Sequence, residues 1–244
     1  MKQLKICLIG YGRMGKEVEK FVIQRGHKVF LKLDNEHDWL NNIQDFLLSD
    51  VAIDFSIPNK VINNIHKCFD GNIPIVVGTT GWYDQLKEVK SWCIETNQSL
   101  FYAPNFSLGM NVVFEMNKLL AALTATYNYK FVISETHHIN KIDAPSGTAI
   151  QLANDIIDKN SGYLGWKIGQ HVADNLISIE VTRRENVSGI HEITAQSEED
   201  KICLRHEAKG LDGFALGAVL AAEFLYDKKG IYTIDDLLNA ALKR

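Results

Sequence analysis

Fifteen residues, from Glu135 to Ala149, concentrate the side chains that could carry out acid–base chemistry. They read Glu-Thr-His-His-Ile-Asn-Lys-Ile-Asp-Ala-Pro-Ser-Gly-Thr-Ala. Adjacent histidines at the end of a strand point to opposite sides, so only one of His137 and His138 can face a given reacting atom. Lys141 adds a mobile cation that can also donate a proton. The segment therefore predicts a site of proton transfer.

The end of this segment is typical of a helix start that binds an anion. Pro145 fixes the entry of the chain, and Ser146, Gly147 and Thr148 then present N–H groups and hydroxyls at the positive end of a helix. Glycine at position 147 lets a ligand approach the backbone closely. A lone histidine or a Ser-Gly-Thr helix cap is usually structural, but their occurrence together favours a binding site for a carboxylate.

A second group of candidate residues lies in a glycine-rich turn near the N-terminus. The turn follows an apolar run and opens a helical pattern, which is the context of a dinucleotide-binding fingerprint. Its first glycine permits the tight turn, the second lets the backbone approach a pyrophosphate, and the third allows close packing of helix and strand. A turn needed only for packing is the alternative. The predicted cofactor-binding residues here are Gly10, Tyr11, Gly12, Arg13, Met14 and Gly15.

Asp34 stands at the end of the second predicted strand, nineteen residues beyond Gly15. A carboxylate at this place accepts hydrogen bonds from the adenosine ribose hydroxyls and repels a 2′-phosphate. Asn35 follows it and no arginine does, although Lys32 is close. The cofactor is therefore predicted to be NADH or NADPH, with NADH modestly favoured. An ordinary loop aspartate is the alternative.

Two further loops follow predicted strands of the same sheet. In an open parallel sheet, the loops at the carboxyl ends of the strands line the ligand crevice. Plain turns between strand and helix are the alternative, but their position at the same edge as the glycine-rich turn favours contact with the cofactor. The candidates are Gly78, Thr79 and Thr80 in one loop, and Ala103, Pro104, Asn105 and Phe106 in the other.

The elements that must position these residues follow two patterns. Up to about residue 107, short apolar runs (5–9, 28–33, 51–55, 73–77 and 99–102) alternate with helical segments (16–25, 59–69 and 83–96). Strands that are apolar on both faces and separated by helices indicate an α/β fold with a Rossmann-like, doubly wound parallel sheet.

The second pattern begins near residue 108. A helix at 109–124, a strand at 130–135 and a helix opening near Pro145 precede three strand-like runs at 176–183, 191–196 and 201–206. Strands that arrive together predict a smaller α+β domain with a mostly antiparallel sheet. Helices at 214–226 and 233–242 close the chain and are expected to return to the first domain. The predicted domains are 1–107 with 212–244, which binds dinucleotide, and 108–211, which binds substrate and forms oligomers.

Composition narrows the class of protein. The net charge is −4 over 244 residues, which gives no electrostatic reason to expect a nucleic acid or an anionic membrane as partner. The four cysteines form no CxxC pair, so neither a disulfide framework nor a metal site is predicted. No signal segment or membrane-length apolar run is recognised, and a cytoplasmic location is expected.

The segment 135–149 resembles the dihydrodipicolinate reductase family, in which Glu-x-His-His-x-x-Lys-x-Asp-Ala-Pro-Ser-Gly-Thr-Ala is nearly a fingerprint. This pattern is far more specific than a glycine-rich turn. Agreement extends over most of the chain, including the Gly-Arg-Met-Gly of the first turn and the stretches Asp54 to Ser56, Gly78 to Gly81, Ala103 to Gly109, Gly189 to Glu192 and Phe214 to Ala218.

The resemblance implies an NAD(P)H-dependent reductase of lysine and diaminopimelate biosynthesis. Hydride would be delivered to C4 of a cyclic dicarboxylic imine derived from hydroxytetrahydrodipicolinate, and a proton would be supplied as tetrahydrodipicolinate forms. It implies that His137 is the general acid/base and that Lys141 is a proton donor and carboxylate partner. His138, Gly147 and Thr148 would hold the small dicarboxylic substrate, assisted by Ser146. The family is typically a homotetramer.

Two departures from the family pattern leave alternatives open. The first loop usually carries one more residue, and an arginine usually stands where this chain has Leu211. Its loss would either weaken the hinge or be compensated by Lys209. A catalytically idle NAD-binding regulator is one alternative, although it would not need His137 and Lys141. Another Rossmann amino-acid dehydrogenase is the second, but it would not be expected to carry the segment 135–149.

Overall fold

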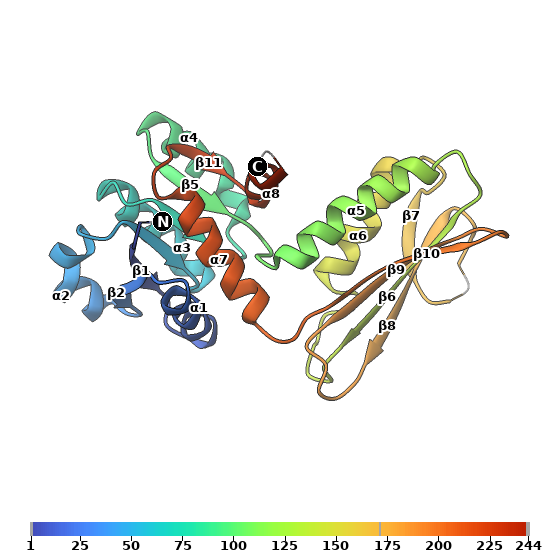
Figure 1. Ribbon diagram of the computed structural model, residues 1–244, viewed down its shortest axis with the longest axis horizontal. Helices are drawn as coiled ribbons and strands as arrows, with labels where there is room; N and C mark the ends of the chain where they lie inside the picture. The colour runs from blue at the N-terminus through green and yellow to red at the C-terminus, as the bar shows by residue number, and fades with distance from the viewer. Residues whose placement is uncertain (1, 171, 243–244) are drawn as a thin grey trace. The chain divides into compact units, whose positions relative to one another are not determined.

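The computed structural model describes residues 2–170 and 172–242, which form two compact units (Figure 1). The first unit comprises Met1–Leu108 with Leu211–Arg244, and the second comprises Gly109–Gly210. The predicted boundaries lie one residue from these at each junction. Among the described residues, no helix is long and apolar enough to cross a membrane.

Six strands form the sheet of the first unit, in the order β11-β5-β4-β3-β1-β2. All neighbouring strands are parallel. The prediction of a parallel Rossmann-like sheet is confirmed, although the last strand, β11, was not predicted from its short sequence. The strands are β1 (Lys5–Ile9), β2 (Lys28–Leu33), β3 (Val51–Asp54), β4 (Ile75–Val77), β5 (Ser99–Tyr102) and β11 (Gly230–Tyr232).

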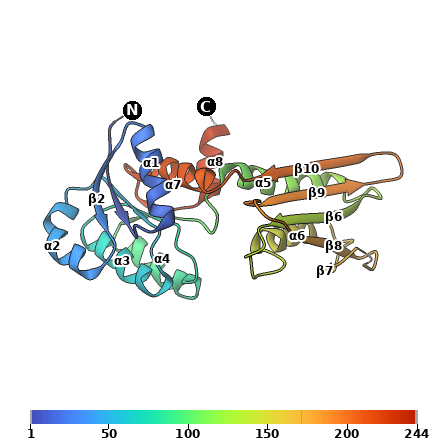
Figure 2. The same ribbon diagram turned by 90° about the horizontal axis from the view of Figure 1, so that it is seen from below.

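Helices cover both faces of this sheet, as Figure 2 shows. One core cluster packs α1 (Arg13–Gln24), α7 (Asp212–Leu225) and α8 (Ile234–Leu242) against one face. A second core cluster packs α2 (Glu36–Phe46), α3 (Pro58–Asp70) and α4 (Leu86–Glu95) against the other face. The 3₁₀ turn η1 (Tyr83–Gln85) directly precedes α4. The C-terminal helices therefore complete a layer that α1 begins.

Helix α2 was not predicted. Its N-terminus has a capping box, in which the Asn35 side chain accepts from the Asp38 N–H at 3.1 Å while the Asp38 carboxylate accepts from the Asn35 N–H at 3.2 Å. Trp39 and Phe46 are buried, but Leu40 is 78% exposed. This exposed leucine weakens the helical spacing of apolar residues in the sequence. The capping box, in contrast, could have been recognised from the sequence.

The second unit has a mixed five-stranded sheet in the order β10-β9-β6-β8-β7. The two antiparallel ladders have seven residue pairs each, and the two parallel ladders have six and four. The mostly antiparallel sheet is confirmed, while β7 and the parallel pairing of β8 with β6 were not predicted. The elements are α5 (Leu108–Thr124), β6 (Lys130–His137), α6 (Gly147–Lys159), β7 (Gly165–Ile168), β8 (Leu176–Arg183), β9 (Ile190–Gln196) and β10 (Lys201–Glu207).

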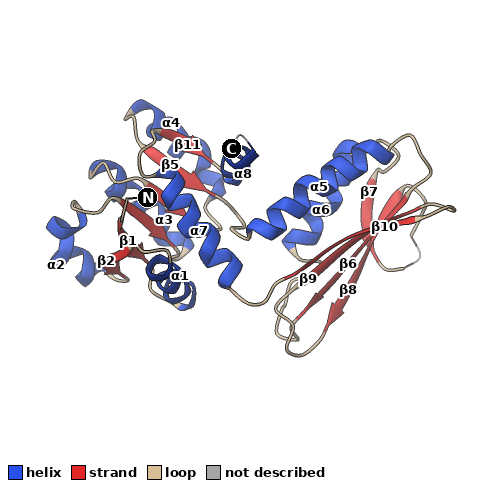
Figure 3. Cartoon of the chain, in the orientation of Figure 1, coloured by secondary structure: helices blue, strands red, loops and turns tan. Residues whose placement is uncertain are grey.

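Helices α5 and α6 pack on one face of this sheet (Figure 3). On that face β6 presents Phe131 and Ile133 to the core, and then Glu135 and His137 at its carboxyl end. His191 lies opposite Glu135 in the register of β9. The covered face is therefore apolar at one end of the strands and polar at the other.

Candidate active site

The glycine-rich turn after β1 has the geometry that its sequence predicts. Gly10 has a φ of +82°, and a Cβ there would lie 2.4 Å from the Phe55 carbonyl oxygen. A Cβ at Gly15 would lie 2.3 Å from the Gly10 carbonyl oxygen. At Gly12, in contrast, a Cβ would meet nothing within 4 Å. Two of the glycines are therefore required by packing, and the space beside Gly12 is open to a ligand.

Gly12 is also the N-cap residue of α1, and no side chain caps this helix start. The first N–H groups of a helix have no partner within it, and the helix dipole adds a partial positive charge. Arg13 begins the helix and is exposed. The loop therefore fits the pyrophosphate of a dinucleotide, which it would bind through the free N–H groups beside Gly12.

The Asp34 side chain lies beside this loop. Its Oδ1 accepts a hydrogen bond from the Tyr11 N–H at 2.7 Å. The Lys32 ammonium is 2.9 Å from the Tyr11 hydroxyl and 2.7 Å from a Glu19 carboxylate oxygen. Lys32 thus has an acidic partner already, and within the described part of the chain Asp34 forms no ion pair.

Asp54, at the end of β3, is a buried carboxylate that the sequence reasoning did not assign to the site. It accepts from the Ser56 N–H at 3.0 Å, from Asn64 at 2.8 Å and from the Thr79 hydroxyl at 2.5 Å. Burial raises its pKa, and these hydrogen bonds act in the opposite direction. Asp54 ties the loops after β3 and β4 to α3, and it occupies the Thr79 hydroxyl.

The other predicted cofactor residues divide into exposed and buried positions. Thr80 and Pro104 are exposed, and Asn105 is half-buried and accepts from the Ser107 N–H at 2.8 Å. Ala103 and Phe106 are core residues, so only their backbone is available to a ligand. Gly78 is required by packing, because a Cβ there would lie 2.1 Å from the Phe55 ring.

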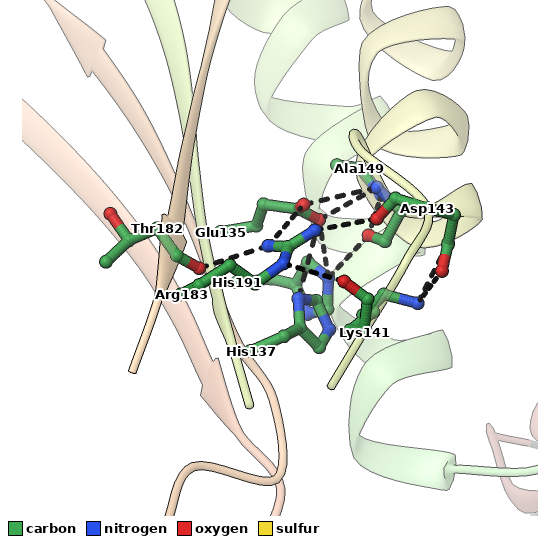
Figure 4. A network of polar contacts seen from close by, with 9 residues as sticks. Glu135, His137, Lys141, Asp143, Ala149, Thr182, Arg183 and His191 are labelled. Atoms are coloured by element: carbon green, nitrogen blue, oxygen red, sulfur yellow. Dashed lines mark hydrogen bonds and ion pairs between the residues drawn. The ribbon is translucent and has the colours of Figure 1, made fainter. Parts of the chain in front are cut away.

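The acid–base segment runs from the end of β6, through a loop, into α6 (Figure 4). His137 is buried on the helix-covered face and His138 is exposed, so the two rings point apart as predicted. The Lys141 ammonium is 2.8 Å from both carboxylate oxygens of Asp143. Both groups belong to the loop that leads from the strand to the helix.

The start of α6 has open backbone donors. Ser146 is the N-cap residue, and its hydroxyl accepts from the Ala149 N–H at 3.2 Å. Gly147 and Thr148 are the first two helical residues, whose N–H groups cannot be satisfied within the helix. A Cβ at Gly147 would meet nothing within 4 Å. This end of α6 therefore has both the donors and the space that a carboxylate requires.

Three residues of the site were given no role from the sequence: Glu135, which begins the segment 135–149, Arg183 and His191. The buried Glu135 carboxylate accepts from the Ser146 N–H at 3.0 Å and lies 3.4 Å from the Arg183 guanidinium. The ring of His191 packs edge-on against that of His137, with centroids 5.0 Å apart. The readable signal was the alternation along β6 and β9, which places Glu135, His137 and His191 on the apolar face of their strands.

Burial has shifted the pKa of both buried histidines. Burial lowers the pKa of His137; Glu135 raises it, while Lys141 and Arg183 lower it further. Burial, followed by the charges of His137 and His206, lowers the pKa of His191 to about 3. His191 is therefore neutral at physiological pH, and the balance of charges around His137 decides its protonation.

Glu135, His137 and His191 could in principle hold a metal ion, since their ligand atoms lie within 4.8 Å of one another. The Glu135 carboxylate, however, already has the Arg183 cation and the Ser146 N–H as partners. A divalent cation would compete with both of these donors for the same carboxylate. The arrangement is that of a hydrogen-bonded polar cluster, in which Arg183 supplies the compensating charge.

The chain joins an α/β unit of the dinucleotide-binding type to a unit that has a histidine, a lysine and an anion-binding helix start. This combination defines the class of nicotinamide-dependent oxidoreductases. Two family models match the chain: "Dihydrodipicolinate reductase, N-terminus" over residues 4–106 and "Dihydrodipicolinate reductase, C-terminus" over residues 109–238. The chain therefore belongs to the dihydrodipicolinate reductase family, and it is an NAD(P)H-dependent oxidoreductase of lysine and diaminopimelate biosynthesis.

Individual relatives agree with this family. The 4-hydroxy-tetrahydrodipicolinate reductase of Christiangramia forsetii is 45% identical over 241 residues, covering 98% of this chain and 100% of that protein. The enzyme of the same name from Methanopyrus kandleri is 36% identical, covering 78% of this chain and 71% of its own. A dipicolinate-bound dihydrodipicolinate reductase from Paenisporosarcina has the same fold, with a TM-score of 0.74 at 23% identity, covering 95% of this chain and 98% of its own.

Proposed function

We propose that the chain is a 4-hydroxy-tetrahydrodipicolinate reductase, in which the segment 135–149 supplies the proton and binds the two carboxylates of the substrate. The observation that carries this proposal is the convergence of His137, Lys141 and the open start of α6 at the polar end of one sheet face. A reduced nicotinamide supplies hydride when bound, and the chain must provide the matching proton. The relatives that carry this activity as their name support the same reaction.

Substrate binding is assigned to the exposed donors of the segment. The N–H groups of Gly147 and Thr148 would donate hydrogen bonds to one carboxylate at the positive end of α6, where the Ser146 hydroxyl caps the helix. Lys141 would pair with the other carboxylate, and the substrate anion would then replace Asp143 as its partner. His138 is exposed beside the same loop and would contact the substrate from the other side of the strand end.

Proton transfer is assigned to His137 and Lys141. The Nδ1 of His137 faces Glu135 at 3.7 Å, which leaves Nε2 as the nitrogen for the substrate. Hydride addition builds negative charge on the conjugated system, and an imidazolium or ammonium beside it offsets that charge. Because burial lowers the pKa of His137, the groups that stabilise its charged form matter for turnover.

Cofactor binding is assigned to the loops of the first unit, with NADH preferred over NADPH. The open space at Gly12 and the uncapped start of α1 support pyrophosphate binding. The Asp34 carboxylate supports the ribose contact and disfavours a 2′-phosphate, and Glu19 partly offsets the charge of Lys32. Thr79 and Phe106 would take part through their backbone only, since their side chains are buried.

We further propose a homotetramer formed through the second unit, in the cytoplasm. In the described part of that unit, both helices pack on one face of the sheet, and half-buried side chains such as Val132, Ser134 and Thr136 lie on the other. A one-sided sheet commonly pairs with another subunit. All four cysteines are free, and three of them are buried, which suits a reducing compartment.

A coupled assay tests the proposal. Pyruvate and aspartate semialdehyde are condensed by a synthase to generate the unstable substrate in place, and loss of nicotinamide absorbance is followed for NADH and NADPH separately. We expect synthase-dependent oxidation, faster with NADH, and a loss of about 100-fold in kcat for His137→Gln. Cofactor binding without oxidation would overturn the proposal in favour of an idle NAD-binding regulator, and Leu211→Arg would then be the first reversion to make.

A further inference from the structure

The Glu135 carboxylate is the centre of a polar cluster that joins four elements of the second unit. Its side chain is fully buried, and it lies 3.4 Å from the Arg183 guanidinium on β8, 3.7 Å from His137 Nδ1 and 3.8 Å from His191 Nε2. Its oxygens also accept from the Ser146 N–H at the start of α6. One carboxylate therefore contacts the proposed acid, the proposed anion site and a neighbouring strand.

Arg183 connects this carboxylate to the loop that carries Lys141. Its guanidinium donates to the Asp143 carbonyl oxygen at 2.6 Å and to the Lys141 carbonyl oxygen at 3.3 Å. A buried carboxylate without a partner is strongly destabilising, so the guanidinium has an electrostatic reason to remain between Glu135 and the loop. The position of the loop that carries Lys141 is thus set by Arg183, whose guanidinium is held by the Glu135 carboxylate on the sheet.

His137 is surrounded by charged and titratable groups from each of these elements. Glu135 on β6 and Asp143 on the loop favour its charged form, whereas Lys141 on the loop and Arg183 on β8 disfavour it, in addition to the effect of burial. The ring of His191 on β9 packs against it, is neutral at physiological pH and supplies no charge. The Nδ1 of His137 is buried and has no hydrogen-bond partner among the described residues.

We infer that Glu135 and Arg183 are positioning residues with opposite effects on His137: Glu135, 3.7 Å from Nδ1, favours the charged form of the imidazole, while Arg183 fixes the Lys141 loop and restrains that charge. The inference rests on the proposed function, because it assigns His137 as the acid. It gives a reason for a carboxylate and a guanidinium to lie at the polar end of an otherwise apolar face. Neither group needs to touch the substrate.

The test is the pH profile of kcat in the coupled assay for Glu135→Gln, Arg183→Gln and the double variant. An acid loses its proton as the pH rises, so kcat declines as the pH rises through the pKa of His137, and this decline is the alkaline limb of the profile. Glu135→Gln removes the group that raises this pKa, so the alkaline limb moves to lower pH and kcat at pH 8 falls at least about tenfold. Arg183→Gln removes a group that lowers it, so the limb moves to higher pH.

The double variant and a matched control separate electrostatics from structure. Glu135→Gln with Arg183→Gln removes both charges together and should move the limb back from its position in Glu135→Gln towards the wild-type position, even if Arg183→Gln alone does not fold. Glu180→Gln changes a carboxylate on β8 that bonds Ser134 at 3.2 Å, and it should leave the limb unmoved. Equal losses of kcat in all variants, with no opposite displacement of the limbs, would overturn the inference.

A second readout does not depend on turnover. The His137 ring can be titrated by NMR in protein labelled at histidine, with His137→Gln to assign its signal and with no substrate present. Glu135→Gln should lower the midpoint of this titration, and Arg183→Gln or the double variant should raise it relative to Glu135→Gln. Absence of synthase-dependent oxidation in the wild type would reject the proposed function, whereas unchanged midpoints in the variants would reject the positioning role alone.

Discussion

The Asp34 carboxylate accepts a hydrogen bond from the Tyr11 N–H at 2.7 Å, so the residue that would select the cofactor also anchors the loop that would bind it. One oxygen holds the glycine-rich turn, and the exposed carboxylate remains available to a ribose. A substitution at Asp34 can therefore act through charge or through the loop. The choice of replacement decides which effect is measured.

Asp34→Asn keeps an acceptor for the Tyr11 N–H and removes the charge. We expect the affinity for NADPH to rise about tenfold, because the repulsion of the 2′-phosphate is removed, while the affinity for NADH falls a few-fold. The measurement is the Kd of each cofactor by nicotinamide fluorescence. Asp34→Ala, which also removes the loop anchor, should weaken binding of both. Unchanged affinities in both variants would show that Asp34 has no part in cofactor choice.

The glycines of the first loop are predicted to differ in what they support. Gly12→Ala places a methyl group in open space, so the melting temperature should stay near that of the wild type while cofactor affinity falls about tenfold. Gly15→Ala brings a Cβ to 2.3 Å from the Gly10 carbonyl oxygen, so it should destabilise the protein by at least about 2 kcal/mol. Thermal unfolding and cofactor titration of both variants check this. Equal losses of stability would contradict it.

Gly147→Ala tests the anion site at the start of α6. Alanine suits a helix better than glycine, and a Cβ at this position meets no neighbour within 4 Å, so stability should be unchanged or higher by up to about 1 kcal/mol. The methyl group would occupy the space proposed for the substrate carboxylate, so KM should rise about tenfold with a smaller change in kcat. Steady-state kinetics and thermal unfolding measure the two effects. An unchanged KM would place the carboxylate elsewhere.

The pH dependence of stability should depend on Glu223, which joins the last long helix to the turn after α1. The Arg25 guanidinium donates to it at 2.8 Å and His27 Nε2 lies 2.9 Å away. Burial raises the pKa of Glu223, but the hydrogen bonds from Arg25 and His27 outweigh it and leave the pKa below its ordinary value of 4.5. A carboxylate whose pKa is lower in the folded than in the unfolded state stabilises the fold at pH values above the unfolded-state pKa. This stabilisation is lost as the pH falls through the folded-state pKa.

Glu223→Gln should therefore lower the free energy of unfolding by about 1–2 kcal/mol at pH 7 and flatten its decline below pH 4.5. Denaturant unfolding at a series of pH values gives both quantities. Glu17→Gln is a matched control, because its partner Lys20 is an exposed neighbour on the same helix. A decline of unchanged steepness in Glu223→Gln would exclude this carboxylate as the source.

Local sequence was sufficient where one contiguous segment makes the structure. The first turn, the five strands up to residue 102 and the opposite orientations of His137 and His138 follow from short-range periodicity and turn chemistry. The short strand β11 and the exposed leucine of α2 left weaker patterns, so these elements were missed. Thr79 was predicted to contact the cofactor, and nothing in the sequence indicated that its hydroxyl also bonds Asp54 from a neighbouring strand.

By itself, the sequence determined the family, the two-part organisation and the residues that we propose for acid–base chemistry, because these lie in contiguous motifs. Only the tertiary structure decided what controls them. Arg183 is forty-eight residues from Glu135, and His191 is forty-five from Ser146, yet the strand register places all four in one cluster. Sequence periodicity shows which face a side chain takes, but the partners on that face depend on strand order, which is fixed only when the whole sheet packs against its helices.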